Sequence, residues 1–311
     1  MTGGGRLRMT ASLLAAMLVV LFGAWAQAPA PPQPSGRPPA SQQDTTPPAA
    51  RPGQAAAPAP AESHARAPFP SGETLYYNIA WRVFTAGEAR MHIQHHRPEG
   101  GKPFWEATVT ANSTGFVSKL YKVEDKMVSR FQNGEMCSTS LTKIIHEGRR
   151  HRDIRINFEK DRGKAVLKET DLAKNEMVRQ VENDIPECVY DVVSALFYVR
   201  SLPLEVGKTL EIQLNDGGQT LPITIEVQAR EEVRTNAGVF RAIRVEPKVF
   251  GGTLFRRSGR MQMWFSDDPQ RLLVQLKARL FVGTISAVLE RVERPAAPPT
   301  PMAQSPAPPA P

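Results

Sequence analysis

Ser194 is the first candidate for chemistry, because a serine nucleophile needs an exposed hydroxyl at a sharp turn. It stands in the run Val192-Val193-Ser194-Ala195, with no glycine beside it and within a segment of helical spacing. A serine inside a helix normally bonds back to its own backbone and allows close packing. The spacing therefore favours a packing role and argues against serine hydrolysis.

Histidines offer a second chemistry, the binding of a metal ion. On a strand, His92 and His96 would point to one face and His95 to the other. His146 and His151 flank a turn and would face each other across a hairpin, but no third ligand stands nearby. We therefore predict no metal site and no cofactor.

Paired carboxylates would suit acid–base catalysis on a glycosidic bond. Asp267-Asp268 is a tight pair, but it precedes a turn, where aspartate caps the backbone with its own side chain. Asp191 and Arg200 lie nine positions apart on the predicted helix and off a common face. We expect each of these two to tie the helix to a strand, and we predict no catalytic residue.

Aromatic and methionine side chains form the one large group that remains. Most of them fit an ordinary hydrophobic core. If the predicted sheet does not close, however, some must line an open apolar groove of the kind that holds a lipid or a hydrophobic peptide. The candidate ligand-binding residues are Tyr77, Trp81, Trp105, Tyr121, Phe197, Met263 and Trp264.

Cys137 and Cys188 are the only two cysteines of the chain. In an oxidising compartment a single bridge between them is the natural hypothesis. The alternative is two separate buried thiols.

Apolar and polar residues alternate with a period of two along the middle of the chain, which is typical of β-strands. We therefore expect β-hairpins to position these side chains. Leu75, Tyr77, Ile79 and Trp81 fall on one face of a first strand, and a second strand follows the turn at residues 85–87. Turn residues rich in Gly, Asn and Asp separate the later strands and predict short antiparallel connections. These strands are expected at 104–110, 126–132, 137–145, 152–158, 165–169, 209–214, 220–228, 240–249, 260–265, 272–280 and 284–292. We therefore predict a mainly β fold, a large curved antiparallel sheet or half-barrel.

One amphipathic helix is predicted over residues 185–201. Asp184 and Glu187 have the spacing of a capping box, Pro186 suits the first turn, and Pro203 ends the helix. Its apolar face is formed by Val189, Val192, Val193, Leu196 and Phe197.

Both ends of the chain differ in composition from its middle. Arg6 and Arg8 precede an apolar run, and Ala26-Gln27-Ala28 suits a signal peptidase, so we expect a signal peptide over residues 1–28, with an uncleaved anchor as the alternative. Thirteen of the 28 prolines lie in residues 29–70 and eight in 295–311. We expect disordered Pro/Ala-rich segments at 29–70 and 294–311, around one β-rich domain over 71–293.

The charge excludes a class of partner. The formal net charge is +8, and Arg149, Arg150, Arg152 and Arg155 form its one dense run. These arginines alternate with apolar residues, as on the solvated face of a strand, so we expect no nucleic acid. An exported chain would be periplasmic or in the cell envelope, and no transmembrane span remains after signal cleavage.

The order of several motifs resembles that of a known family. They are Gly72-Glu73-x-Leu75-x-Tyr77, Ala86-Gly87-Glu88-Ala89, Tyr121 with Asp125, Glu147-Gly148, Asp191-x-x-Ser194-Ala195-x-x-Tyr198-x-Arg200, Gly207-Lys208, Gly238-x-Phe240, and Trp264-x-Ser266-Asp267-Asp268 with Arg271. Over about residues 71–290 they resemble the bacterial exported family called domain of unknown function 3108. The resemblance implies an exported, mainly antiparallel β protein, and it supplies no activity.

These features allow three hypotheses for the function, each from a different functional class. The first hypothesis is a non-enzymatic binding or carrier module of the cell envelope, which holds an apolar ligand such as a lipid, or an envelope protein, in the concave face of the sheet. The alternative is a structural or assembly factor that acts through its proline-rich ends. A hydrolase whose site is assembled from distant strands is a distant third.

Overall fold

The computed structural model describes residues 69–249, 260–280 and 283–295. Fourteen strands, two α-helices and one 3-10 turn (Lys160–Arg162) make up this described part. The strands are β1 Thr74–Trp81, β2 Phe84–His96, β3 Phe104–Ser113, β4 Glu124–Gln132, β5 Ser138–Glu147, β6 Arg150–Glu159, β7 Lys164–Asp171, β8 Glu176–Asp184, β9 Thr209–Asn215, β10 Thr220–Thr235, β11 Gly238–Val249, β12 Arg260–Ser266, β13 Leu273–Leu280 and β14 Gly283–Glu293. The helices are α2 Gly115–Leu120 and α3 Val192–Ser201.

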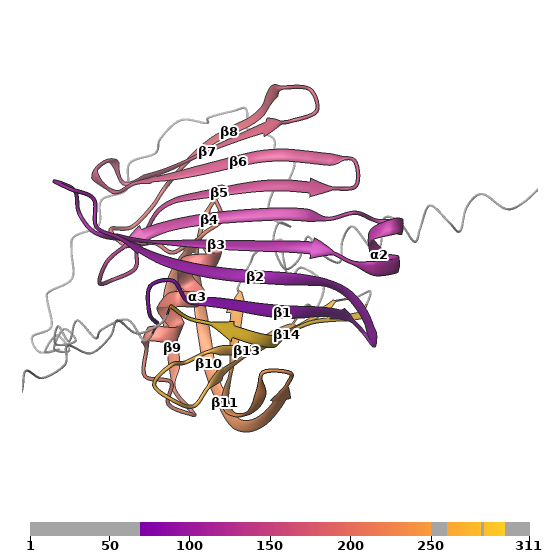
Figure 1. Ribbon diagram of the computed structural model, residues 1–311. Coiled ribbons are helices and arrows are strands. Elements are labelled where there is room, and N and C mark those ends of the chain that lie inside the picture. The colour runs from indigo at the N-terminus through magenta and orange to yellow at the C-terminus, as the bar shows by residue number, and fades with distance from the viewer. Residues whose placement is uncertain (1–68, 250–259, 281–282, 296–311) are drawn as a thin grey trace, which may run out of the picture.

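All fourteen strands belong to one antiparallel sheet (Figure 1). Their order is β8-β7-β6-β5-β4-β3-β2-β1-β14-β13-β12-β11-β10-β9. Neighbours are therefore consecutive in sequence except where β1 pairs with β14 in the middle of the sheet. The sheet does not close into a barrel, and β8 and β9 are its two edges. The predicted mainly β, curved antiparallel architecture is confirmed.

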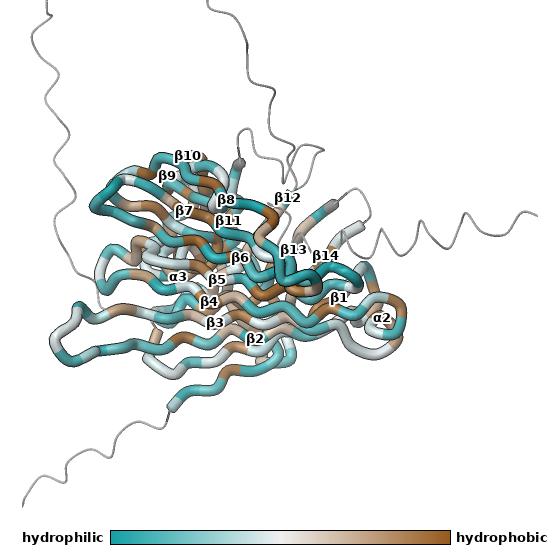
Figure 2. The backbone as a smooth tube through the Cα atoms, turned by 90° about the horizontal axis from the view of Figure 1, so that it is seen from above, coloured by the Kyte–Doolittle hydropathy of each residue, from teal (hydrophilic) through white to brown (hydrophobic). Residues whose placement is uncertain are grey.

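Alternation along each strand gives the sheet one buried face. Leu75, Tyr77 and Ile79 of β1 are buried together, as their spacing predicted. Trp81 was predicted on the same face but is only half-buried. Trp81 is the last residue of β1, directly before the β1–β2 turn. Hydrophobic and hydrophilic segments alternate along the strands in Figure 2.

The two edges of the sheet meet at one corner. Asn215 donates through Nδ2 to Oδ1 of Asn183 on β8, at 2.7 Å, and Asn183 donates to the carbonyl of Gly217, at 3.1 Å. Gly217 lies in the turn between β9 and β10, and a Cβ there would stand 2.6 Å from the Cδ1 atoms of Ile156 and Leu167. The turn is therefore pressed against β6 and β7, so side chains rather than a ladder join the edges.

Helix α3 packs against β3, β4 and β9, and it begins later than predicted. The expected start at residue 185 and the expected cap at Asp184 are wrong. The chain just before the helix is extended instead, since Val189 accepts from the backbone of β5 (2.9 Å) and Tyr190 donates to that of β9 (2.8 Å). Asp191 is the N-cap, and Leu202, the residue before Pro203, is extended and ends the helix as predicted.

Two elements had no counterpart in the prediction. Strand β8 is an edge strand whose residues are mostly polar and exposed, so it carries little of the apolar alternation that marks a strand. Helix α2 has six residues and one buried side chain, Val117, which is too few to show a helical period.

The predicted signal peptide and most of the predicted proline-rich segments lie outside the described residues. At their borders, Phe69 is buried in the core and Arg294 is bonded to Glu73. Within the described ranges, no helix combines the length and apolar character that a membrane-spanning helix requires.

Candidate functional site

The seven predicted ligand-binding residues are dispersed over the sheet, α3 and the C-cap of α2, and most are buried. Tyr77, Trp105, Phe197, Met263 and Trp264 are each at most 7% exposed. Trp81 and Tyr121 are half-buried.

An aromatic cluster accounts for two of the seven. The ring of Phe69 lies 5.1 Å from that of Trp105 and 5.0 Å from that of Phe197, both in edge-to-face contact. Phe197 also stacks on Phe131 of β4, at 5.8 Å. These contacts fill the space between α3 and strands β3 and β4 with the protein's own rings.

The other predicted residues belong to different surroundings. Tyr77 donates its hydroxyl to the carbonyl of Leu273, at 2.9 Å. Met263 and Trp264 are adjacent on β12, so they lie on opposite faces of the sheet. Trp264 donates Nε1 to Glu231, at 2.8 Å, and the Lys277 ammonium lies 5.3 Å from its ring. Trp264 is therefore covered by polar side chains on the outer face.

The cap of α3 contains Ser194 in a closed network. Asp191 accepts from the backbone N–H groups of Val193 and Ser194, and from the hydroxyls of Ser129 (2.6 Å) and Ser138 (2.8 Å). The Ser194 hydroxyl donates back to the Asp191 carbonyl and is itself fully buried. The predicted packing role of Ser194 and the tie from Asp191 to the strands are both confirmed.

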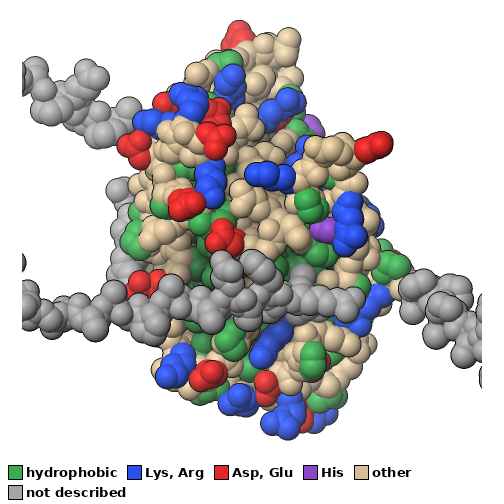
Figure 3. Space-filling model, turned by 90° about the vertical axis from the view of Figure 1, so that its left-hand side faces the viewer, with side chains coloured by type: hydrophobic (Ala, Val, Ile, Leu, Met, Phe, Trp, Pro, Cys, Tyr) green, Lys and Arg blue, Asp and Glu red, His purple; other side chains and the backbone are tan. Residues whose placement is uncertain are grey.

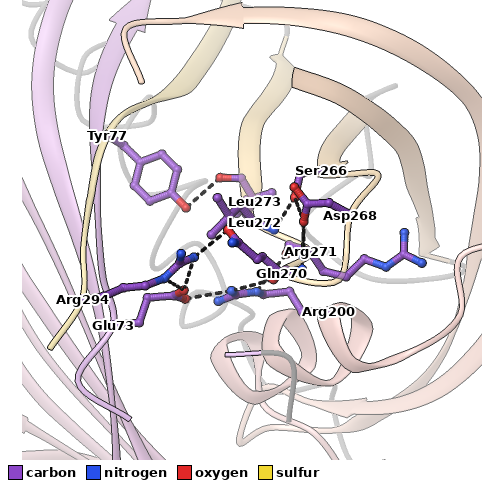
Figure 4. A network of polar contacts seen from close by, with 10 residues as sticks. All are labelled: Glu73, Tyr77, Arg200, Ser266, Asp268, Gln270, Arg271, Leu272, Leu273 and Arg294. Atoms are coloured by element: carbon purple, nitrogen blue, oxygen red, sulfur yellow. Dashed lines mark hydrogen bonds and ion pairs between the residues drawn. The ribbon is translucent and has the colours of Figure 1, made fainter. Parts of the chain in front are cut away.

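Arg200 anchors the other end of α3 (Figure 4). Its guanidinium donates to Glu73 of the segment before β1 (2.8 Å) and to the carbonyls of Gln270 (3.2 Å) and Arg271 (2.9 Å) in the β12–β13 turn. Arg294 donates to the second oxygen of Glu73, at 3.1 Å. Both Arg200 and Glu73 are 1% exposed, so this is a buried ion pair that ties α3 to both ends of the described chain.

Asp268 completes the same region as a turn residue. Its Oδ1 accepts from the backbone N–H groups of Gln270 and Arg271, at 2.8 and 3.2 Å. Asp267 instead pairs with Arg230, at 2.9 Å. The predicted capping of the turn backbone is confirmed for Asp268, whereas the Asp267 carboxylate pairs with arginine side chains.

Asp125 and Glu147 form a buried carboxyl pair on β4 and β5, which the sequence analysis missed. They are 5% and 1% exposed. The backbone N–H of His146 donates to Asp125, at 3.0 Å, and Arg150 pairs with Glu147, at 3.3 Å. Burial, with the charge of Asp125 as the second cause, raises the pKa of Glu147 to about 7. Tyr121 packs on Gly148 beside this pair, and burial followed by the charge of Glu147 raises its pKa to about 12.

Lys143 is the second missed group. Its side chain points inward from β5 and is 3% exposed, and it has no hydrogen bond or ion pair with the described residues. Met127 and Ile154 are its apolar cross-strand neighbours. Burial lowers the pKa of Lys143, and Asp216 opposes this. A lysine alternating with Leu141 and Ile145 was the signal that could have identified it.

Metal ligands are scarce in the described part of the chain. His146 and His151 face each other across the β5–β6 hairpin, with 2.8 Å between their Nδ1 atoms, as the spacing predicted. The one group with metal-ligand spacing among the described residues is Glu135, Cys137 and Cys188. The structure joins its two sulfurs in a disulfide, so they are not available as thiolate ligands.

Residues 76–290 match the family described as "Protein of unknown function (DUF3108)", which confirms the resemblance. No curated protein is significantly similar in sequence.

Three solved structures resemble the fold. A β-barrel-like protein of domain of unknown function DUF1849 from Brucella abortus is 8% identical, with a TM-score of 0.47, and the match covers 72% of this chain and 97% of that one. A proposed exported protein with a YmcC-like fold from Bacteroides fragilis is 11% identical, with a TM-score of 0.33 and coverages of 72% and 97%. A proposed lipoprotein from Parabacteroides distasonis is 12% identical, with a TM-score of 0.33 and coverages of 72% and 96%.

Proposed function

This chain belongs to the DUF3108 family, and because that family supplies no activity, we propose from the structure that the protein is a non-enzymatic binding module of the cell envelope. We further propose that it binds its partner through its outer surface rather than in the concave face of the sheet. Export to the envelope rests on the signal-like N-terminus.

The packing of the concave face supports this choice. A groove that admits a lipid chain would leave its lining accessible to water. On β1 to β7, however, the apolar inward side chains before the strand ends are buried. They are Leu75, Tyr77, Ile79, Ala89, Met91, Ile93, Trp105, Ala107, Val109, Ala111, Met127, Phe131, Leu141, Ile145, Ile154, Ile156, Phe158, Ala165 and Leu167.

The same burial weakens the case for an enzyme. Ser194, Asp125, Glu147 and Lys143 have types suited to nucleophilic or acid–base chemistry, and all are at most 5% exposed. A substrate would have to reach them through the packed core, whereas a catalytic group needs contact with the reacting atoms.

One observation carries the proposal: exposed large apolar side chains gather at one end of the sheet. Val83 and Phe84 are 87% and 64% exposed, and Phe116 and Leu120 of α2 are 73% and 55% exposed. We call residues 81–85 and 114–122 the α2 end; it lies at the right in Figure 1. Contiguous exposed apolar side chains on a folded domain mark interaction surfaces.

Site-specific photo-crosslinking in the producing bacterium tests the proposal. A benzoyl-phenylalanine at position 116 should form crosslinks, and the same group at position 239 should not. Val239 is the matched control, because it is 60% exposed and lies on β11, outside the α2 end. Equal labelling at the two positions would contradict a specific outer surface.

Native mass spectrometry of the full chain separates the proposal from its rivals. We expect the intact protein mass without bound lipid. A stoichiometric lipid would favour a carrier with an internal site. A variant that lacks residues 29–68 or 296–311 could fail to capture a partner that Phe116→Ser still captures. That result would favour an assembly factor that acts through its proline-rich ends.

A further inference from the structure

The α2 end is built from two projections that the backbone holds together. The turn between β1 and β2 carries Val83 and Phe84, and α2 carries Phe116 and Leu120. Thr114, directly before α2, donates its N–H to a carbonyl at the start of β2, at 3.2 Å. The four exposed apolar side chains therefore belong to one region.

The scaffold beneath this region is tightly fitted. At Gly87 of β2, a Cβ would stand 2.3 Å from the carbonyl oxygen of Asn112 on β3, so no side chain fits between these backbones. Val117 is the buried residue that anchors α2. Arg82 donates its N–H to Thr284 of β14, at 2.9 Å, which fixes the β1–β2 turn. The apolar side chains thus project from a fixed base.

The charge of the α2 end has one sign. Residues 81–85 and 114–122 contain Arg82, Lys119 and Lys122 and no aspartate or glutamate. All three cationic residues are exposed, and Lys122 pairs with Glu124 of β4, at 2.9 Å. On the side of the molecule that faces the viewer in Figure 3, acidic and basic side chains are interspersed instead.

Exposed apolar side chains close in sequence to exposed cationic side chains suit one kind of partner. A stable protein–protein interface uses roughly 20–30 residues a side, which is far more than four side chains supply. Reversible association with a bilayer needs only a few inserted apolar groups together with attraction to anionic headgroups, because the two contributions add. Half-buried Trp81 is the last residue of β1, directly before the same turn, and tryptophan is a residue favoured at membrane interfaces.

We propose that the α2 end docks the protein on the surface of an anionic phospholipid bilayer, with Val83, Phe84, Phe116 and Leu120 inserted and Arg82, Lys119 and Lys122 against the headgroups. This inference rests on the proposed function and names the partner of its outer surface. It makes the membrane, and not a ligand in the sheet, the anchor of the module.

Vesicle co-sedimentation tests the inference. The exported full chain, with its N-terminus identified by mass, is mixed with vesicles of phosphatidylglycerol and phosphatidylcholine, or of phosphatidylcholine alone. We expect binding to the anionic vesicles that weakens with added salt. Phe84→Ser and Phe116→Ser should each weaken it about ten-fold, and Lys119→Gln about five-fold.

Val239→Ser is the control, and it should bind as the unchanged protein does. Thermal unfolding of each variant shows whether the fold is kept, which we expect because all four replaced side chains are exposed. Unchanged binding in Phe84→Ser and Phe116→Ser, or equal binding to neutral vesicles, would overturn membrane docking.

The crosslinking result distinguishes the two proposals. No vesicle binding together with a protein crosslinked at position 116 would overturn membrane docking and leave the outer-surface binding module standing. No vesicle binding and no difference between positions 116 and 239 would overturn both.

Discussion

Replacing Arg200 by methionine should destabilise the protein by about 3 to 5 kcal/mol, the range for breaking a buried ion pair by removing one partner. The substitution removes three hydrogen bonds, to Glu73 and to the carbonyls of Gln270 and Arg271. Glu73 is 1% exposed, and Arg294 would be its one remaining ionic partner among the described residues, so its carboxylate would stay buried and partly uncompensated. Methionine also removes the cation–π contacts of the guanidinium with the rings of Phe69 (4.9 Å) and Phe197 (5.5 Å), and these contacts add to the expected loss.

Urea unfolding followed by tryptophan fluorescence measures this loss. For a domain of this size, each kcal/mol of lost stability lowers the Tm by about 2 to 4 °C. The Tm of Arg200→Met should therefore be about 6 to 20 °C lower than that of the unchanged protein. Arg155→Met is the matched control: Arg155 is paired with Asp153, but its side chain is 68% exposed, and the expected loss is below about 1 kcal/mol.

A double-mutant cycle tests the reason for the loss. Adding Glu73→Gln to Arg200→Met removes the stranded carboxylate, so the double variant should be more stable than the sum of the two single losses predicts. A loss below about 1 kcal/mol for Arg200→Met, or strict additivity in the cycle, would refute the assignment of Arg200 as the buried anchor of α3.

Four further outcomes follow from particular residues. Gly217→Ala should cost at least about 2 kcal/mol more than Gly134→Ala in urea unfolding, because both glycines have φ near +90° but only Gly217 faces side chains of β6 and β7; equal losses would mean that the turn is not pressed into the sheet. Burial and Asp125 raise the folded pKa of Glu147 to about 7 from its ordinary 4.5, so the stability from its protonated form is full below about pH 4.5 and is lost as the pH rises through about 7. Unfolding measured across that range should show this fall, on the order of 3 kcal/mol, and Glu147→Gln should flatten it; an equally steep fall in that variant would contradict the assignment. Lys143→Met should gain on the order of 1 kcal/mol, since it removes a buried cation without a hydrogen-bond partner among the described residues, and a loss would reveal a role for the charge. Thiol titration of the denatured, unreduced chain should find no free thiol, and reduction should release two and cost about 4 kcal/mol of stability.

Local patterns were enough to predict the architecture, because the two-residue alternation of apolar and polar side chains is visible within each strand. The alternation of Leu75, Tyr77 and Ile79 and the turn residues between strands predicted antiparallel hairpins, and the sheet has them. The helix start at residue 185 was wrong although Asp184 and Glu187 have capping-box spacing. Two elements were missed because their local signal is weak. Edge strand β8 buries little, and α2 is too short to show a period.

The candidate sites depended on contacts that no local pattern contains. Asp191 and Arg200 were predicted to tie the helix to strands, yet their partners lie 53 to 127 positions away, at Ser129, Ser138 and Glu73. Asp125 and Glu147 become a carboxyl pair only because β4 and β5 are neighbours in register. The exposure of Phe84 and Phe116 follows from where their projections leave the sheet.

The amino-acid sequence by itself determined the strand periods, the turn chemistry and the family, since these are encoded within a few residues or in the order of motifs. Only the tertiary structure decided which aromatic rings fill the interior, where the two sheet edges meet and which apolar side chains are left in water. The physical reason is that burial depends on the packing of the whole chain. The residue type of an aromatic side chain does not show whether the folded sheet covers it or leaves it exposed.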